Sequence, residues 1–134
     1  MQIFQKKLLP TYDVFDEARY FSAGESPFSI VHKGKHVAVT ICEDIWNVDS
    51  DLHANNPLSL IASEKPDLLI NLSASPWYLG KQELRLSILK KAVKLVDCPI
   101  CYVNSVGGND ELIFDGKSVL MDSNGQVLHQ AKSF

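Results

Sequence analysis

Residues 39 to 46 read VTICEDIW, and the interpretation of the whole sequence starts from this stretch. A run of β-branched and apolar residues leads to Cys42, which is followed at once by Glu43 and Asp44. The pattern predicts a strand that ends in a thiol. Ligands of open α/β sheets gather beyond the carboxyl ends of the strands, so Cys42 is either a nucleophile or a small buried residue that closes the strand.

The segments around this strand predict further strands. FSIVHKGKHVAVTI (28–41) has alternating apolar residues on both sides of Gly34, which is typical of a hairpin. DLLINLS (67–73) and ICYVN (100–104) predict buried strands, and KSVLMDSNGQVLHQ (117–130) predicts a final hairpin that turns at Asn124 and Gly125. SVGGNDEL (105–112) is interpreted as a structural loop that could contact a partner domain.

Two helices are expected between these strands. Asn56-Pro57 suits a helix start, and Lys65-Pro66 ends that helix. Gly80 to Val96 has helical apolar spacing that includes Leu84, Ile88 and Leu95. Strands that alternate with helices predict an α/β layered fold, in one domain over residues 1–134.

Composition limits the classes of function. The chain has 134 residues, 46% of them hydrophobic and 22% charged, with a formal net charge of −3, and no basic run longer than a pair. Nucleic-acid binding needs a phosphate-neutralising stripe that the sequence does not provide. No apolar stretch approaches the ~20 residues of a membrane span, and the N-terminus has no long apolar region, so we expect a cytoplasmic protein without a membrane anchor.

Cys98-Pro-Ile-Cys101 has a spacing found in redox and zinc sites. There is no second pair, and the motif opens an apolar strand rather than preceding a helix, which favours buried free thiols. The histidines fall in no metal or triad motif and are interpreted as structural: His32, His36, His53 and His129. We therefore expect no metal site.

A catalytic Cys42 would need a nearby cation, because Glu43 and Asp44 disfavour the thiolate. The same acids also suit the first turn of a helix, where they face the positive end of its dipole. The local sequence is compatible with both interpretations. A lysine or arginine would have to come from another part of the chain.

Four segments in order resemble the nitrilase-type (carbon–nitrogen hydrolase) glutaminase domain of glutamine-dependent NAD synthetases. They are KKLLPTYDVFDEARYF, VTICEDIW, NLSASPWYLGK and VGGNDELIFDG, and the resemblance runs from about Lys6 to Phe134. The resemblance implies part of a four-layer α-β-β-α sandwich. It also implies that Lys6 and Cys42 are members of a Glu-Lys-Cys triad, and that Glu17 is a second glutamate that orients the site. The non-catalytic alternatives are that Lys6 and Lys7 form a solvated basic pair and that Glu17 is a surface acid paired with Arg19.

The resemblance further implies a pocket for the amino-acid end of L-glutamine. Aromatic residues would form its walls, Glu43 would meet the α-ammonium, and Lys81 and Ser75 the α-carboxylate. The positions that match this set are Tyr12, Phe15, Glu43, Ser75 and Lys81. Each alone would be an ordinary loop or helix-start residue.

The implied activity is hydrolysis of L-glutamine through a thioester on Cys42. The ammonia would pass to a synthetase domain, of the same or a partner chain, that makes NAD from deamido-NAD and ATP. The chain itself would hold no cofactor, since ATP and Mg²⁺ would belong to the synthetase domain.

The sequence departs from the family pattern in one respect. The first triad glutamate, the general base, lies in a preceding segment that this sequence does not contain, so the chain resembles the C-terminal half of the domain. We expect it to be inactive alone, to expose an apolar face and to form homo-oligomers. Two alternatives stay open: part of a stand-alone nitrilase-type amidase, and a non-catalytic remnant or binding module.

Overall fold

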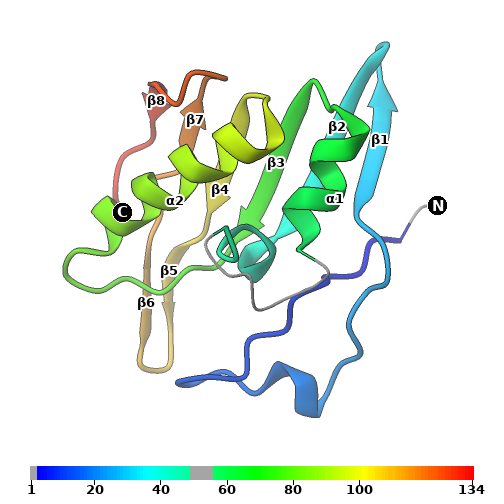
Figure 1. Cartoon of the computed structure of the whole chain (residues 1–134). Coiled ribbons are helices and arrows are strands. Elements are labelled where there is room, and N and C mark those ends of the chain that lie inside the picture. Colours follow the sequence, from blue (N-terminus) through cyan, green and yellow to red (C-terminus); the bar gives the residue numbers. More distant parts are fainter. Residues whose placement is uncertain (1–2, 49–55) are drawn as a thin grey trace.

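The core of the fold is a six-stranded mixed sheet with the strand order β1-β2-β3-β4-β7-β8. The computed structural model describes residues 3–48 and 56–134 (Figure 1). His53, one of the histidines interpreted above, lies outside the described residues. The sheet strands are β1 (Phe28–His32), β2 (Lys35–Ile41), β3 (Leu68–Ser73), β4 (Ile100–Asn104), β7 (Val119–Met121) and β8 (Val127–Gln130).

The three central strands run parallel, and antiparallel hairpins flank them on both sides. Val39 of β2 pairs with Ile70 of β3, and Ile70 pairs with Cys101 of β4. β1 and β2 form the predicted hairpin, and β7 and β8 form the predicted final one. Because β2, β3 and β4 are parallel, their carboxyl ends at Ile41, Ser73 and Asn104 share one edge of the sheet.

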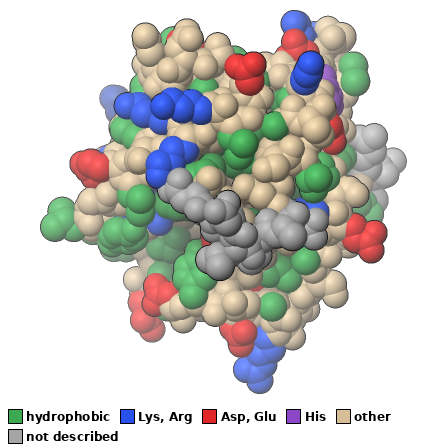
Figure 2. Space-filling model, in the orientation of Figure 1, with side chains coloured by type: hydrophobic (Ala, Val, Ile, Leu, Met, Phe, Trp, Pro, Cys, Tyr) green, Lys and Arg blue, Asp and Glu red, His purple; other side chains and the backbone are tan. Residues whose placement is uncertain are grey.

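Helices α1 (Pro57–Glu64) and α2 (Lys81–Val96) lie on the same face of this sheet (Figure 1). Asn56 caps α1 by accepting a hydrogen bond from the Leu58 amide, and Pro57 occupies the first turn, as the sequence predicted. Lys65 follows α1 with a φ of 50°, in the left-handed region that ends a helix. The helical face of the molecule has positive and negative side chains interspersed (Figure 2).

The buried face of α2 differs in part from the predicted apolar stripe. Ile88 is buried, but Leu84 and Leu95 are 42% and 37% exposed, so placing them on the apolar face was wrong. Arg85 is instead fully buried, because it pairs with Asp115 across the helix–sheet boundary at 3.1 Å. The apolar spacing of α2 did not predict this buried ion pair.

The segment predicted as a loop over 105–112 is largely a hairpin. β5 (Val106–Asn109) and β6 (Leu112–Asp115) pair antiparallel in a separate two-stranded sheet. The turn falls at Asp110, whose φ of 51° is left-handed. The two consecutive glycines concealed this hairpin, because glycine has low strand propensity while Gly107 adopts a φ of 134° that suits it there.

The sheet face opposite the helices is apolar. A row of paired positions crosses five strands on that face, from Phe28 through Val39, Ile70 and Cys101 to Leu120. Leu72 and Val103 on the same face are 47% and 41% exposed. The two helices and the six-stranded sheet therefore form one helical layer on one sheet layer, which is half of an α-β-β-α sandwich.

Candidate active site

Cys42 sits at a sharp turn where strand β2 passes into a short 3₁₀ helix, η2 (Cys42–Ile45). Its φ is 46°, a left-handed conformation that costs a non-glycine residue about 1–2 kcal/mol. Asp44 holds the turn, because its Oδ2 accepts a hydrogen bond from the Ile41 amide at 3.0 Å. Backbone strain of this kind concentrates at functional sites, where surrounding contacts enforce it.

Lys6 and Glu17 form an ion pair close to this turn. The Lys6 Nζ donates to Glu17 Oε2 at 2.7 Å, and only 14% of the Lys6 side chain is exposed. Glu17 begins the 3₁₀ turn η1 (Glu17–Arg19). Lys6 is not a solvated surface residue, since its side chain is mostly buried. Glu17 does not pair with Arg19, which lies near Asp16 instead.

Opposing influences act on the Cys42 thiol. Burial raises its pKa and is the largest effect, and the charges of Glu43 and Glu17 raise it further. The Lys6 ammonium and a backbone hydrogen bond from Ala74 lower it. The net pKa lies above the ordinary value of a cysteine. The cation that a catalytic Cys42 requires is therefore present, together with a backbone donor.

A pocket of about 300 Å³ opens beside the thiol. It brings together six residues from three segments far apart in the sequence. These are the residues that the resemblance assigned to the nucleophile and the amino-acid end of the substrate: Tyr12, Phe15, Cys42, Glu43, Ser75 and Lys81. Lys6 and Glu17 line a different cavity of about 500 Å³ beside Leu9 and Phe21. The Lys6 charge still reaches the Cys42 thiol.

One wall of the pocket carries a carboxylate. The Tyr12 hydroxyl donates to Glu43 Oε2 at 2.6 Å, which fixes where that carboxylate lies. Burial raises the pKa of Tyr12, and its hydrogen bond to Glu43 raises it further, so the phenol stays a donor. Phe15 packs edge-on against the Tyr12 ring, with 6.1 Å between the ring centroids. A cationic group entering the pocket would meet Glu43 between aromatic walls.

The pocket is also lined by Lys81, the first residue of α2. Its Nζ lies 3.8 Å from the centroid of the Trp46 ring and 5.0 Å from that of Tyr78, close enough for cation–π attraction. Burial lowers the pKa of Lys81, and the neighbouring Arg85 charge lowers it further. The pocket lining therefore includes both a carboxylate and a partly desolvated ammonium, a combination that suits a zwitterionic ligand.

Sequence reasoning missed two residues of this site. Trp46 holds Lys81, and Asp44 joins the Lys6 segment to the Cys42 turn, because its Oδ1 accepts from the amides of Lys7 and Leu8 at 3.1 and 2.7 Å. Burial raises the pKa of the Asp44 carboxyl, and these amide donors lower it. The only signal in the sequence was their position two and four residues after Cys42.

The remaining cysteines and histidines lie apart from the pocket. Cys98 and Cys101 are free thiols, and burial raises the pKa of Cys98 to about 11. His36 Nε2 lies 3.4 Å from Glu64 Oε2. Within residues 3–48 and 56–134, no group of three or more His, Cys, Asp or Glu side chains is arranged to hold a metal ion. The helices described in those ranges are all too short or too polar to span a membrane.

Solved structures place the fold in a class. The chain superposes on an amidase from Nesterenkonia sp. with a TM-score of 0.78 at 21% identity, over 97% of this chain and 45% of the amidase. It superposes on a carbon–nitrogen hydrolase from Helicobacter pylori with a TM-score of 0.80 at 20% identity, over 96% and 47% of the two chains. The fold is therefore that of the nitrilase-type carbon–nitrogen hydrolases, as predicted, and the chain has part of it.

Closer sequence relatives narrow this class. The chain is 43% identical over 137 residues to a glutamine-dependent NAD⁺ synthetase from Synechocystis sp., covering 99% of this chain and 25% of the relative. It is 41% identical over 132 residues to one from Aquifex aeolicus, covering 98% and 22%. A structure of the Acinetobacter baumannii synthetase with ADP gives a TM-score of 0.87 at 39% identity, over 98% of this chain and 24% of that one.

The chain is therefore homologous to a segment of the glutamine-dependent NAD⁺ synthetases, which confirms the predicted resemblance. It spans about a quarter of the length of the curated relatives that it matches. No family model matches the sequence.

Proposed function

We propose that this chain is the cysteine-bearing part of a glutaminase domain that hydrolyses L-glutamine and supplies ammonia for the synthesis of NAD. The observation that carries the proposal is the pocket of about 300 Å³ that Cys42, Glu43 and Lys81 line together. The homology to glutamine-dependent NAD⁺ synthetases supports the choice of substrate.

In the proposed complex, the pocket binds glutamine by its amino-acid end. The Glu43 carboxylate meets the α-ammonium, and Lys81 and Ser75 meet the α-carboxylate. Tyr12 and Phe15 pack along the aliphatic side chain. This arrangement would direct the γ-carboxamide toward Cys42, and the charges at the far end would select an amino acid over a simple amide.

The proposed reaction proceeds in two steps. The Cys42 sulfur attacks the γ-carbonyl carbon, the C–N bond breaks, and ammonia leaves with the proton that the thiol released. Water then attacks the γ-glutamyl thioester, which gives glutamate and regenerates the thiol. The Lys6 ammonium, oriented by Glu17 at 2.7 Å, stabilises the thiolate and the oxyanion of each tetrahedral intermediate.

The general base is proposed to be a glutamate from a preceding segment of the domain, so this chain alone should not turn over glutamine. ATP and Mg²⁺ would be bound by a synthetase domain and not by this chain. The likeness to solved amidases shows the fold alone, and the charged pocket favours glutamine over the amidase alternative.

A segment exchange tests this proposal. The matching segment of the Synechocystis relative is replaced by this chain, and NAD⁺ synthesis is measured with glutamine and with free ammonia. We expect both activities in the exchanged protein, and little turnover of acetamide or propionamide. Ammonia-dependent synthesis without any glutamine-dependent synthesis would contradict the proposed glutaminase role.

A further inference from the structure

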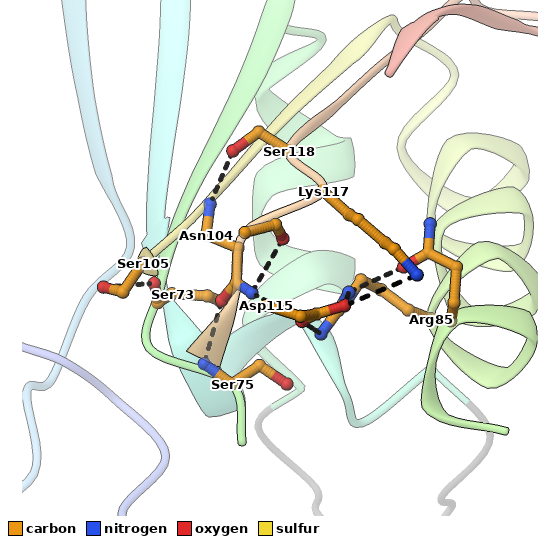
Figure 3. Close-up of polar contacts among 10 residues, drawn as sticks. Ser73, Ser75, Arg85, Asn104, Ser105, Asp115, Lys117 and Ser118 are labelled. Atoms are coloured by element: carbon orange, nitrogen blue, oxygen red, sulfur yellow. Dashed lines mark hydrogen bonds and ion pairs between the residues drawn. The ribbon is translucent and has the colours of Figure 1, made fainter. Parts of the chain in front are cut away.

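Asn104 is a buried residue at the same edge of the sheet as the Cys42 turn, and the resemblance gave it no role. It is the last residue of β4 and is 6% exposed. Its Oδ1 accepts a hydrogen bond from the Ser75 amide at 2.9 Å. Its Nδ2 donates to the Gly116 carbonyl at 2.9 Å and lies 3.5 Å from Asp115 Oδ1. Figure 3 shows Asn104 between Ser75 and Asp115.

These partners allow one orientation of the carboxamide. Gly116 and Asp115 present acceptors, and Ser75 presents a donor. A flipped amide would place its oxygen against a carbonyl and a carboxylate, and its NH₂ against an N–H group. Oδ1 is therefore directed at the Ser75 amide.

The partners of Asn104 are themselves held in place. Arg85 NH2 donates to Asp115 Oδ1 at 3.1 Å, and both side chains are 1% exposed. The backbone amide of Asn104 donates to Ser118 Oγ at 3.0 Å (Figure 3). A buried network in which most groups are paired is rigid, so Asn104 has little freedom to move.

The backbone that Asn104 holds passes beside the nucleophile. Ser75 is 2% exposed and lines the pocket, and the residue before it, Ala74, makes the backbone hydrogen bond to the Cys42 thiol. Ala74 and Ser75 follow the end of β3, so the hydrogen bonds between paired strands do not fix their backbone. The Asn104 side chain takes the place of a neighbouring strand by accepting from the Ser75 amide.

We propose that Asn104 is a positioning residue of the Cys42 site, which holds the Ala74-Ser75 backbone against the thiol through the hydrogen bond from the Ser75 amide to its Oδ1. The inference rests on the proposed function only in taking Cys42 as the nucleophile. Asn104 itself lines neither of the two cavities described above.

A purely structural role would act on stability and leave the thiol unchanged. The test therefore measures both in the 134-residue chain. The free energy of unfolding comes from urea titration. The reactivity of Cys42 comes from its rate of alkylation by iodoacetamide, in which a C–S bond forms, the C–I bond breaks and iodide leaves. Peptide mapping separates Cys42 from the other two cysteines, and the rate is followed from pH 6 to 10.

Two substitutions of similar size separate the roles. Asn104→Leu and Asn104→Asp both lose the amide donor to Gly116, but only Asn104→Leu loses the oxygen that accepts from Ser75. We expect Asn104→Leu to slow alkylation at pH 8 by about three- to tenfold, the effect of one hydrogen bond, and to move the pH profile of Cys42 upward. Asn104→Asp should keep more of the wild-type rate than Asn104→Leu, because a carboxyl oxygen can still accept from the Ser75 amide.

Ser118→Ala is the matched control. It removes one hydrogen bond to Asn104 but leaves the bond from Ser75 intact, so stability should fall without a change in the Cys42 profile. Asn104→Leu and Ser118→Ala add no charge, whereas Asn104→Asp adds a carboxyl group beside Asp115. All three leave in place the ionisable groups that act on Cys42 or respond to its charge: Lys6, Tyr12, Glu17, Glu43, Lys81 and Tyr102.

An unchanged Cys42 profile in a folded Asn104→Leu chain would overturn the proposal, and so would an equal loss in Ser118→Ala. If Asn104→Leu does not fold, the proposal is tested by the hydrogen-exchange rate of the Ser75 amide in the wild-type chain. A protected Ser75 amide supports the proposal, and exchange at the rate of an open loop overturns it. None of these outcomes depends on glutamine turnover, so they are independent of the segment exchange.

Discussion

At the scale of single residues, the chemistry of the site depends on charges placed around one thiol. Burial raises the pKa of Cys42, and the Lys6 charge lowers it. Glu17 accepts from Lys6 at 2.7 Å and so fixes the position of that charge. The ammonium is held at the edge of the site by an ion pair that is itself largely shielded from solvent.

Cys42→Ala tests the nucleophile in the exchanged Synechocystis protein. We expect glutamine-dependent NAD⁺ synthesis to fall about a thousandfold or more, because no other thiol lines the pocket. Synthesis from free ammonia should stay at the level of the unmutated exchange. Loss of both activities would argue against a separate glutaminase site.

Lys6→Met tests the cation in the chain itself. Its removal leaves Glu17 and Glu43 to act on the thiol, and both raise the pKa of Cys42. We expect the alkylation profile of Cys42 to shift to higher pH, so that the rate at pH 8 falls. Lys7→Met is the control, because the Lys7 Nζ donates to the Glu25 carbonyl in an exposed contact. Equal profiles for the two variants would remove Lys6 from the site.

At the scale of elements, Asp44 connects the loop that carries Lys6 to the turn that carries Cys42. Its two oxygens accept hydrogen bonds from the backbone amides of Lys7, Leu8 and Ile41. Asp44 is 1% exposed, so these bonds are shielded from water. The relative position of the two site segments is therefore set by a residue that lines neither the pocket nor the Lys6 cavity.

Asp44→Asn should weaken this connection. An amide has one accepting oxygen, so its NH₂ group must face at least one backbone N–H and leave it unpaired. We expect a loss of about 1–3 kcal/mol in the free energy of unfolding, measured by urea titration, and faster hydrogen exchange at Lys7 and Leu8. Asn56→Ala is the comparison, since loss of the α1 cap should cost about 1 kcal/mol without affecting those two amides.

At the scale of the whole molecule, the sheet has helices on one face and an apolar second face. On the second face, the side chains of Leu72 and Val103 are 47% and 41% exposed. Leu72 pairs with Ile41 on one side and with Val103 on the other, so the three residues form a row across the sheet. Exposed apolar surface of this extent favours association, and we propose that the isolated chain forms homo-oligomers through this face.

Sedimentation velocity tests this proposal. We expect an apparent mass above 14.9 kDa that rises with concentration. Val103→Lys should lower the mass toward that of the monomer, because a charge on this face must be desolvated in any sheet-to-sheet contact. Leu95→Lys is the matched control, since Leu95 is similarly exposed, at 37%, but lies on α2. A concentration-independent monomer would contradict the proposal.

The sequence by itself determined most of the order of strands and helices and the end of a strand at Cys42. Apolar periodicity, the Asn56-Pro57 start of α1 and the Asn124-Gly125 turn are local signals that neighbouring residues carry. It failed at the β5–β6 hairpin, where paired glycines hide the strands, and at Arg85, where a buried ion pair interrupts the periodicity.

Only the tertiary structure decided which polar groups meet. Lys6 with Glu17, Asp44 with Lys7 and Leu8, Lys81 with Trp46, and Asn104 with Ser75 are pairs whose members lie 11 to 37 residues apart. No local pattern specifies such pairs. The parallel order of β2, β3 and β4 brings the ends of three strands to one edge of the sheet, and the pairs Lys81–Trp46 and Asn104–Ser75 form beyond that edge.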